Sequence, residues 1–277
     1  MESELISIIL PTHNGARYIK RAVASVMVQT YTTWELLIVN DGSTDDTKLV
    51  AHGLVAVEPR IRILENAENL GIQKTLNRGL RESRGAYIAR IDDDDTWSDS
   101  TKLEKQMAFF ARNKDYILVG TGTILIDEQG KELIRYLVPQ TDPAIRNKLL
   151  SKNCFVHSSV LIKREPLMSI GGYGESKAVR HLEDYDLWLR LGRIGKLGNL
   201  GMYGVTFMLR RGGLSSQHKL EQARKSLRLV HVYRHDYPHY IGSLFRATLR
   251  IFVYGFLVRF PLQVFVNRLA KYYKEKW

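Results

Sequence analysis

The first hundred residues alternate apolar runs with amphipathic segments, and this order constrains the fold more than any other feature. The run at 5–10 (Leu-Ile-Ser-Ile-Ile-Leu) is apolar on both faces, which is typical of a strand buried inside a parallel sheet, and Pro11 is expected to end it. The pattern predicts strands at 5–10, 34–39, 60–64 and 85–89. It predicts helices at 16–29 and 72–83, and between them a helix for which Ser43 or Thr44 would be the N-cap. This order predicts an α/β fold with a mostly parallel central sheet and right-handed crossovers.

Beyond residue 100 the pattern is less regular. It predicts further elements in this order: a helix to about 113, strands at 116–121 and 123–127, a hairpin turn at 127–131, a strand at 155–162, a permissive glycine loop at 171–174, a helix over 180–191 and a strand at 205–210. We therefore expect one α/β domain at 1–216, followed by a basic helical region at 217–277.

Polar residues stand where the predicted strands end. Thr12 follows the first strand, Asp41 the second, and Asp92 to Asp95 the fourth. The carboxyl ends of parallel strands form the ligand crevice of an open α/β sheet, so we expect these side chains to converge. The turn after the first strand lacks the G-x-G-x-x-G pattern, which disfavours a dinucleotide-binding dehydrogenase.

Four consecutive carboxylates, Asp92 to Asp95, repel one another unless solvent or a cation neutralises them. Their hard oxygen atoms suit Mg²⁺ or Mn²⁺, and such ions usually also hold substrate phosphates. The alternative is that Asp94 or Asp95 caps a helix beginning near Ser98. A cap needs one acid and the sequence offers four, so a metal–phosphate site is favoured.

The net charge of +12 is unevenly distributed. Residues 210–277 hold 14 Lys and Arg against three acids, which leaves the first 209 residues nearly neutral. The single cysteine, Cys154, excludes an intramolecular disulfide framework. No secretory signal pattern opens the sequence, so a reducing cytosolic compartment is expected.

The segment 240–277 interleaves aromatic and basic side chains. Its longest uncharged run is 251–258, whereas a membrane span needs about 20 apolar residues. The pattern favours a basic amphipathic helix that lies on an anionic membrane surface. The protein would then be a peripheral protein of the inner face of the membrane. A packing helix or a dimer face is the alternative.

Four motifs resemble those of the family 2 glycosyltransferases of the GT-A fold. They are Ser7–Asn14 (Ser-Ile-Ile-Leu-Pro-Thr-His-Asn), Leu37–Asp45 (Leu-Ile-Val-Asn-Asp-Gly-Ser-Thr-Asp), Ile91–Asp95 and Glu183–Trp188 (Glu-Asp-Tyr-Asp-Leu-Trp). The resemblance covers about residues 5 to 216. It implies an inverting transferase that moves a sugar from a nucleotide donor, and the absence of a Gln-x-x-Arg-Trp motif implies single-sugar addition.

The resemblance also implies residue roles. Nucleotide contacts fall on Pro11, Thr12, Asn14, Asp41, Ser43, Asp92 and Asp93. Lys74 and Arg78, one helical turn apart, are candidates for phosphate binding, with a solvated helix face as the alternative.

The D-x-D motif of the family falls on Asp92 and Asp94 as metal ligands, with Asp95 as a substitute because the register is open by one residue. Asp184 corresponds to the general base, which would take the proton from the acceptor hydroxyl. Acceptor or diphosphate contacts are expected from Glu183, Trp188, Arg210 and Arg211, although Trp188 fits a core position equally well. His218 is a candidate third metal ligand; a structural or exposed histidine is the more usual case.

These residues lead to one expected function and two alternatives. We expect a metal-dependent (Mn²⁺ or Mg²⁺) hexosyl- or N-acetylhexosaminyl-transferase that uses a nucleotide-sugar donor, with UDP favoured. Its acceptor would be a glycan or a lipid-linked sugar in cell-surface polysaccharide synthesis. The alternatives are a nucleotidyltransferase, for which the first loop lacks a Gly-rich basic pattern, and a non-enzymatic membrane-binding module. Nucleic acid binding is disfavoured because the basic residues are not distributed over the chain.

Overall fold

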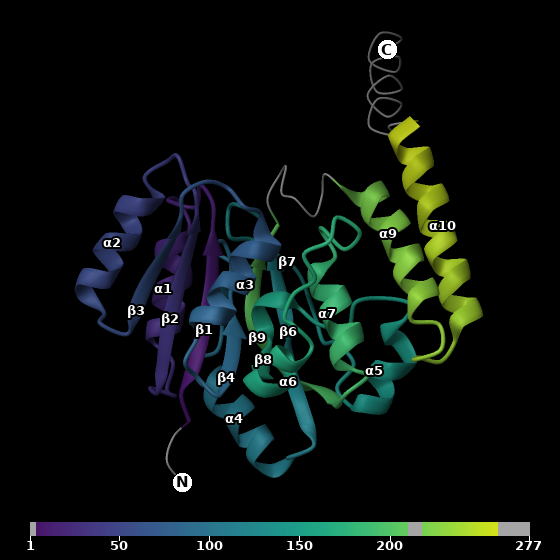
Figure 1. Cartoon of the computed structure of the whole chain (residues 1–277), viewed down its shortest axis with the longest axis horizontal. Helices are drawn as coiled ribbons and strands as arrows, with labels where there is room; N and C mark the ends of the chain where they lie inside the picture. The colour runs from purple at the N-terminus through teal and green to yellow at the C-terminus, as the bar shows by residue number, and fades with distance from the viewer. Residues whose placement is uncertain (1–3, 210–217, 260–277) are drawn as a thin grey trace, which may run out of the picture.

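A computed structural model describes residues 4–209 and 218–259. Nine strands of the described chain form one sheet in the order β3-β2-β1-β4-β8-β6-β9-β5, with β7 paired to β6 (Figure 1). The strands are β1 Ile6–Thr12, β2 Trp34–Asp41, β3 Ile61–Asn66, β4 Tyr87–Arg90, β5 Thr96–Trp97, β6 Tyr116–Ile126, β7 Glu132–Tyr136, β8 Leu161–Lys163 and β9 Lys196–Met208. The helices are α1 Ile19–Met27, α2 Thr47–Val57, α3 Ile72–Glu82, α4 Lys102–Arg112, α5 Asp142–Leu149, η1 His157–Ser159, α6 Arg164–Ser169, α7 Glu183–Leu191, α9 Lys219–Val232 and α10 Tyr240–Arg259.

Strands β1 to β4 pair in parallel, as the β-α order predicts. The expectation that Pro11 ends β1 was wrong, because β1 continues to Thr12 and Pro11 pairs with Val39 of β2. The register between β1 and β4 stops at Ile9, so the proline lies where one side of β1 no longer has a strand neighbour. A residue without an N–H is tolerated at such a place.

Past β4 the sheet becomes mixed. β8 runs antiparallel to both β4 and β6, and β9 runs parallel to β6. The predicted strand at 155–162 was wrong, because this apolar stretch holds the short helix η1 before β8 begins. The two strands predicted around Gly122 are one strand, β6, whose register with β9 shifts at that glycine. The predicted hairpin at 127–131 is confirmed by the antiparallel pairing of β6 and β7.

Apolar side chains cover both faces of the sheet. Ile8 and Leu10 of β1 pack with α1 and α4, whereas Ile9 between them packs with α3 on the other face. Because both faces of β1 are covered by helices, the successive residues from Ile8 to Leu10 are all apolar. The site-forming loops thus extend from strands that are fixed on both sides.

Helix α9 completes the core on the α3 and α7 side. Tyr233 Oη donates to Asp186 Oδ1 at 2.9 Å, and Tyr237 Oη donates to the Leu189 carbonyl at 2.7 Å. α9 and α10 lie side by side at one end of the molecule (Figure 1). The boundary expected at 216 falls among residues outside the described part, and the domain division stays a prediction.

Gly79 of α3 lets that helix approach the sheet closely. A Cβ built there would lie 2.7 Å from Ile9 Cγ2 and 3.3 Å from Val39 Cγ2. Gly53 of α2 has nothing within 4 Å of its ideal Cβ, so the two helical glycines form a matched pair.

We expect Gly79→Ala to lower the free energy of unfolding by about 1–2 kcal/mol, because overpacking outweighs the gain in helix propensity. Gly53→Ala should instead raise it by about 0.5–1 kcal/mol. Urea unfolding followed by circular dichroism measures both. Equal effects of the two substitutions would contradict the close packing of α3 on β1.

Candidate active site

The turn after β1 and the loop after β2 are held together by hydrogen bonds. The backbone N–H of Asn14 donates to Ser43 Oγ at 2.9 Å, and the N–H of Thr44 donates to Asn14 Oδ1 at 2.8 Å. Asn14 adopts a left-handed conformation with φ +56°, which asparagine tolerates better than most residues. The expectation that Ser43 or Thr44 caps the next helix was wrong, because α2 starts at Thr47 and both residues serve this loop contact instead.

Asp41 fixes the loop between β3 and α3. Its Oδ1 accepts from Asn66 Nδ2 at 2.6 Å and from the Leu70 N–H at 2.9 Å, and its Oδ2 accepts from the Gly71 N–H at 3.0 Å. The carboxylate is almost fully buried. Asp41 thus holds the loop 66–71 in place. A nucleotide contact by Asp41 stays a prediction.

The two candidate phosphate ligands of α3 differ in their surroundings. Arg78 Nη1 donates to the Glu65 carbonyl at 2.6 Å and to Asn66 Oδ1, so its guanidinium fastens α3 to the end of β3. Lys74, one turn earlier, is exposed. Lys74 is therefore the better placed of the two to move toward an anion.

The acids that follow β4 surround a buried arginine. Both carboxylate oxygens of Asp92 accept from the guanidinium of Arg90, which is 4% exposed. Although burial works against the charge, Asp92 and Asp95 raise the pKa of Arg90. The alternative of an acidic helix cap was wrong, because α4 begins at Lys102 with Thr101 as its N-cap.

Ser158 of η1 connects this cluster. Its hydroxyl donates to Asp95 Oδ2 and accepts from the Asp92 N–H at 3.1 Å and from Arg90 Nη1 at 3.2 Å. Asp95 is buried, and its other oxygen accepts from the Met208 N–H at 3.2 Å. Burial, together with the charges of Asp92 and Asp94, raises the pKa of Asp95 well above its ordinary value.

The carboxylates of Asp92, Asp94 and Asp95 form one group of ligand atoms, with one oxygen of each within 4.8 Å of the others. Three hard oxygens in this arrangement fit Mg²⁺ or Mn²⁺. A divalent cation would also relieve the mutual repulsion that raises the pKa of Asp95.

Asp93 points to the turn after β1 instead, where its Oδ2 accepts from Thr12 Oγ1 at 2.6 Å. A Cβ on Gly15 would collide with this carboxylate oxygen and with the threonine hydroxyl. The glycine of the first turn is therefore required for the contact between the ends of β1 and β4.

Glu183 and Asp184 occupy the first turn of α7 and are half-buried. Asp184 Oδ2 accepts from Asn153 Nδ2 at 2.7 Å. Burial raises the pKa of Asp184, and the hydrogen bonds from the Tyr185 N–H and from Asn153 oppose this. Burial and the charge of Asp184 raise the pKa of Glu183 to about 7, and Glu183 Oε2 has no hydrogen-bond partner within the described structure.

Arg90 connects the two acidic groups. Its charge acts on the pKa of Glu183, of Asp184 and of Asp95, and its guanidinium pairs directly with Asp92. The end of β4 and the start of α7 therefore lie in one electrostatic neighbourhood. The strand-end prediction concerned Thr12, Asp41 and Asp92 to Asp95, so this neighbourhood adds Glu183 and Asp184 from the start of a helix.

Trp188 belongs to the core under this neighbourhood. Its side chain is fully buried and packs against Phe155 and His157, with ring centroids at 5.5 and 5.7 Å. Of its two interpretations, the core position is thus the one that applies, and a contact with the acceptor was wrong. Arg210 and Arg211 lie outside the described residues.

Comparison with known proteins identifies the family. The family model described as "Glycosyl transferase family 2" matches residues 7–171, which is more than half of the chain. The chain is a family 2 glycosyltransferase. Neither a nucleotidyltransferase nor a non-enzymatic binding module accounts for this match.

Curated relatives of this glycosyltransferase come from several bacteria. It is 34% identical to "Putative glycosyltransferase EpsE" of Bacillus subtilis over 186 residues, which cover 67% of the chain and 66% of EpsE. It is 31% identical over 191 residues to an Escherichia coli protein, "UDP-Glc:alpha-D-GlcNAc-diphosphoundecaprenol beta-1,3-glucosyltransferase WfgD", with 69% of the chain and 71% of the relative covered. A Rickettsia felis glycosyltransferase is matched over only 32% of its length, so the chain spans less than two thirds of some relatives.

Solved structures share the fold. Staphylococcus aureus TarS 1–349 in complex with UDP-GlcNAc superposes with a TM-score of 0.70 at 18% identity, covering 92% of this glycosyltransferase and 76% of that chain. The mannosyltransferase PcManGT from Pyrobaculum calidifontis, in complex with GDP-Man and Mn²⁺, gives a TM-score of 0.64 at 16% identity, with 96% and 79% covered. The GT-A fold expected from the motifs is thus confirmed.

Sequence reasoning missed three residues that organise the site: Arg90, Ser158 and Asn153. Arg90 offered a usable sign, since a charge interrupts an apolar strand directly before four acids. Ser158 and Asn153 offered none, because their partners are 63 and 31 residues distant in the chain.

We expect Glu183→Gln to stabilise the protein at pH 8 by about 1–3 kcal/mol and to have little effect at pH 4.5. A carboxyl whose folded pKa is raised to about 7 binds more protons in the folded chain between its ordinary value of 4.5 and pH 7. Its destabilising effect therefore grows as the pH rises through this window and is complete above it. Urea unfolding at both pH values tests this, with the exposed Glu68→Gln as control; a pH-independent difference would contradict the raised pKa.

Proposed function

We propose that this enzyme transfers a single sugar from a UDP-sugar to a glycan or lipid-linked acceptor, with inversion at the anomeric carbon and with a divalent metal ion. The observation that carries the proposal is that Arg90 pairs with the acid group at the end of β4 and that its charge also acts on Asp184 at the start of α7. The acid group would hold the cation that binds the donor diphosphate, and Asp184 would accept the proton of the acceptor hydroxyl.

Asp92 and Asp94 would hold the metal, with Asp95 supporting them from its buried position. When bound, the ion would neutralise charge on the diphosphate leaving group. Asp92 is shared between this role and its ion pair with Arg90. Asp94 is half-buried, as Asp92 is, and offers a carboxylate oxygen to the same group of ligand atoms.

Asp184 would act as the general base. Its raised pKa makes the carboxylate more basic than an exposed aspartate, which strengthens it as a proton acceptor. The hydrogen bond from Asn153 to Oδ2 orients the carboxylate for this role. The proton moves from the hydroxyl to Asp184 as that oxygen forms its bond to the anomeric carbon and the bond to the diphosphate breaks.

The donor and the acceptor class rest on relatives. UDP-GlcNAc is bound in the TarS structure, and WfgD is named for transfer from UDP-Glc to a diphosphoundecaprenol-linked sugar. The Escherichia coli relative WbnJ is named for O-antigen biosynthesis. We therefore infer a role in cell-surface polysaccharide synthesis.

We expect Asp184→Asn to lower kcat by about 10²–10⁴-fold while UDP affinity stays within about twofold, because the amide cannot accept the proton. UDP release from UDP-GlcNAc and UDP-Glc, assayed with a polyprenyl-linked sugar acceptor, measures turnover; calorimetry measures UDP binding. The control is Asp115→Asn, an exposed aspartate directly before β6. Retained turnover in Asp184→Asn would remove this residue as the base.

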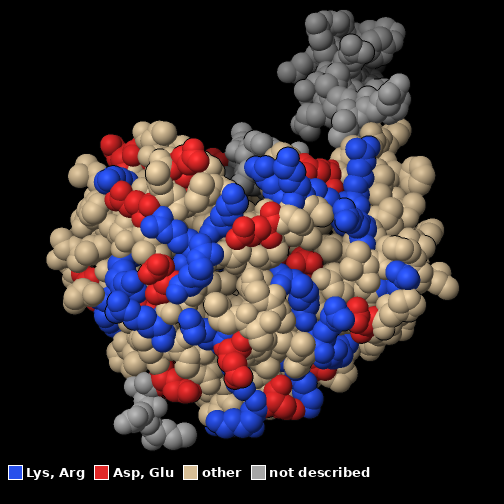
Figure 2. All heavy atoms as spheres, viewed as in Figure 1, with Lys and Arg blue, Asp and Glu red and all other residues tan. Residues whose placement is uncertain are grey.

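Helix α10 carries the feature that suits a lipid-linked acceptor. One face exposes a continuous apolar row, spaced three or four residues apart: Ile241, Phe245, Leu249, Phe252 and Phe256. Figure 2 shows this outer edge mostly uncharged, with Lys and Arg on the side toward α9. No helix among the described residues has the length and apolar content that crossing a membrane requires. We infer that α10 lies on an anionic membrane, at the cytoplasmic surface, with this row in the interface.

We expect Phe245→Asp combined with Phe252→Asp to abolish co-sedimentation with vesicles of anionic lipid, because both side chains are more than 70% exposed and would lose their insertion into the interface. Leu49→Asp combined with Val57→Asp on α2, which are equally exposed, should leave binding unchanged. Undiminished vesicle binding of the α10 variant would contradict membrane docking. If the variant instead turned a dimer into a monomer and kept vesicle binding, this face of α10 would be a dimer interface.

A further inference from the structure

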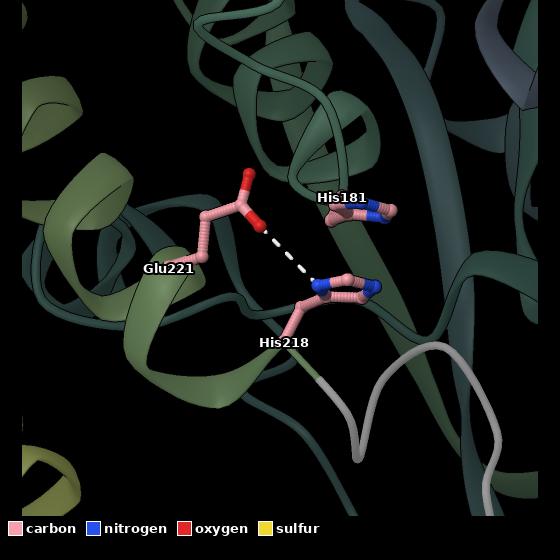
Figure 3. A group of neighbouring side chains, drawn as sticks. All are labelled: His181, His218 and Glu221. Atoms are coloured by element: carbon pink, nitrogen blue, oxygen red, sulfur yellow. Dashed lines mark ion pairs between the residues drawn. The ribbon is translucent and has the colours of Figure 1, made fainter.

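A second group of ligand-type side chains lies at the start of α9. His181, His218 and Glu221 each place one imidazole nitrogen or carboxylate oxygen within 4.8 Å of the other two (Figure 3). His181 comes from the segment before α7, whereas His218 is the N-cap of α9 and Glu221 lies in its first turn. The group shares no residue with the acids that follow β4.

The two imidazole rings are stacked. Their centroids are 4.3 Å apart and their planes differ by 9°. Burial, and then the charge of His218, lower the pKa of His181. A neutral ring keeps a nitrogen lone pair that a metal ion can accept.

Glu221 is held so that its two oxygens serve different partners. Oε1 pairs with Lys225 Nζ at 2.6 Å, and Oε2 faces His218 Nδ1 at 3.2 Å. Lys225 Nζ also donates to the Arg180 carbonyl at 2.9 Å. The lysine therefore fixes the carboxylate and offsets its charge, and it connects α9 to the residue before His181.

We propose that His181, His218 and Glu221 bind one divalent transition-metal ion of the Zn²⁺ type, at a site separate from the donor-binding metal. Two imidazole nitrogens and one carboxylate oxygen suit Zn²⁺ and Co²⁺, whereas Mg²⁺ and Mn²⁺ favour oxygen ligands. The charge of Lys225 further disfavours ions that are held mainly by electrostatic attraction.

Binding requires only side-chain rotation. Tetrahedral zinc ligands are roughly 3.4 Å apart, so ligand atoms now within 4.8 Å must approach and the stacked rings must open. The side chains of His218 and Glu221 are 35% and 47% exposed, so water can reach the fourth position. The helical spacing of these two residues, three positions apart, keeps them on one face of α9.

The site would brace the segment that leads into the active site. His181 stands three residues before Asp184, and it adopts a left-handed backbone with φ +68°. An ion shared by His181 and the first turn of α9 would cross-link two segments that are 37 residues apart in the chain. Its proposed role is structural, since an ion that binds only the folded chain stabilises it by RT ln(1 + M/Kd), where M is the free metal concentration.

A titration of the full-length protein with Co²⁺ tests the proposal. Four-coordinate Co²⁺ with nitrogen ligands absorbs in the visible range far more strongly than octahedral Co²⁺ on carboxylates. We expect one equivalent of the strongly absorbing form, displaced by Zn²⁺, both in the wild type and in Asp92→Asn, Asp94→Asn protein. His181→Ala and His218→Ala should each weaken Co²⁺ binding by at least about tenfold. The exposed His235→Ala is the matched control and should bind as the wild type does.

Glu221→Gln keeps the size of the side chain and provides a third variant if a histidine variant does not fold. The proposal is overturned if the wild type shows no Zn²⁺-displaceable absorption, or if folded His181→Ala, His218→Ala and Glu221→Gln all retain wild-type affinity. The readout is Co²⁺ absorption, so a failure here is distinguishable from a failure of the sugar-transfer proposal.

Discussion

The site depends on one buried cation, Arg90. A guanidinium at 4% exposure is costly unless carboxylates lie close to it, and Asp92 and Asp95 provide them. In turn the arginine permits Asp92 and Asp95 to be held close together, where alone they would repel one another. Its charge extends to Glu183 and Asp184, so two acidic groups that are about ninety residues apart in the chain are arranged around the same cation.

This arrangement separates the acids into different roles. Asp95, buried on Ser158 and the Met208 N–H, shapes the turn. Asp93 turns away to Thr12 and ties β4 to β1. Asp92 and Asp94 are half-buried and belong to the same group of ligand atoms. Four identical residues thus take different roles according to their backbone positions, and the metal requirement that we propose concerns Asp92 and Asp94.

Much of the fold followed from the sequence because local patterns determine it. Strands β1 to β4 were predictable, since each is short, apolar and followed by an amphipathic helix. The stretch 155–162 was not, because its apolar content resembles a strand while Ser158 and Ser159 turn the chain through hydrogen bonds to distant partners. Similarly, Pro11 was misjudged because its tolerance depends on where β4 stops pairing, which is a tertiary fact.

The candidate site was predictable in its residue types but not in its connections. Strand ends supplied Thr12, Asp41 and the acids, and the motifs supplied Asp184. The sequence could not show that Trp188 is core, because a helical residue four positions after a base faces either way until its neighbours are known. Nor could it show that Asp41 already accepts three hydrogen bonds within the β3–α3 loop.

The account rests on oxygen ligands that hold a cation against a diphosphate, and UDP affinity measured with and without Mn²⁺ tests this most directly. Calorimetry on the wild type should show UDP binding that tightens by at least about tenfold when Mn²⁺ is added, and Asp94→Asn should lose this gain while remaining folded. Equal UDP affinity with Mn²⁺ and with a chelator in the wild type would contradict the account.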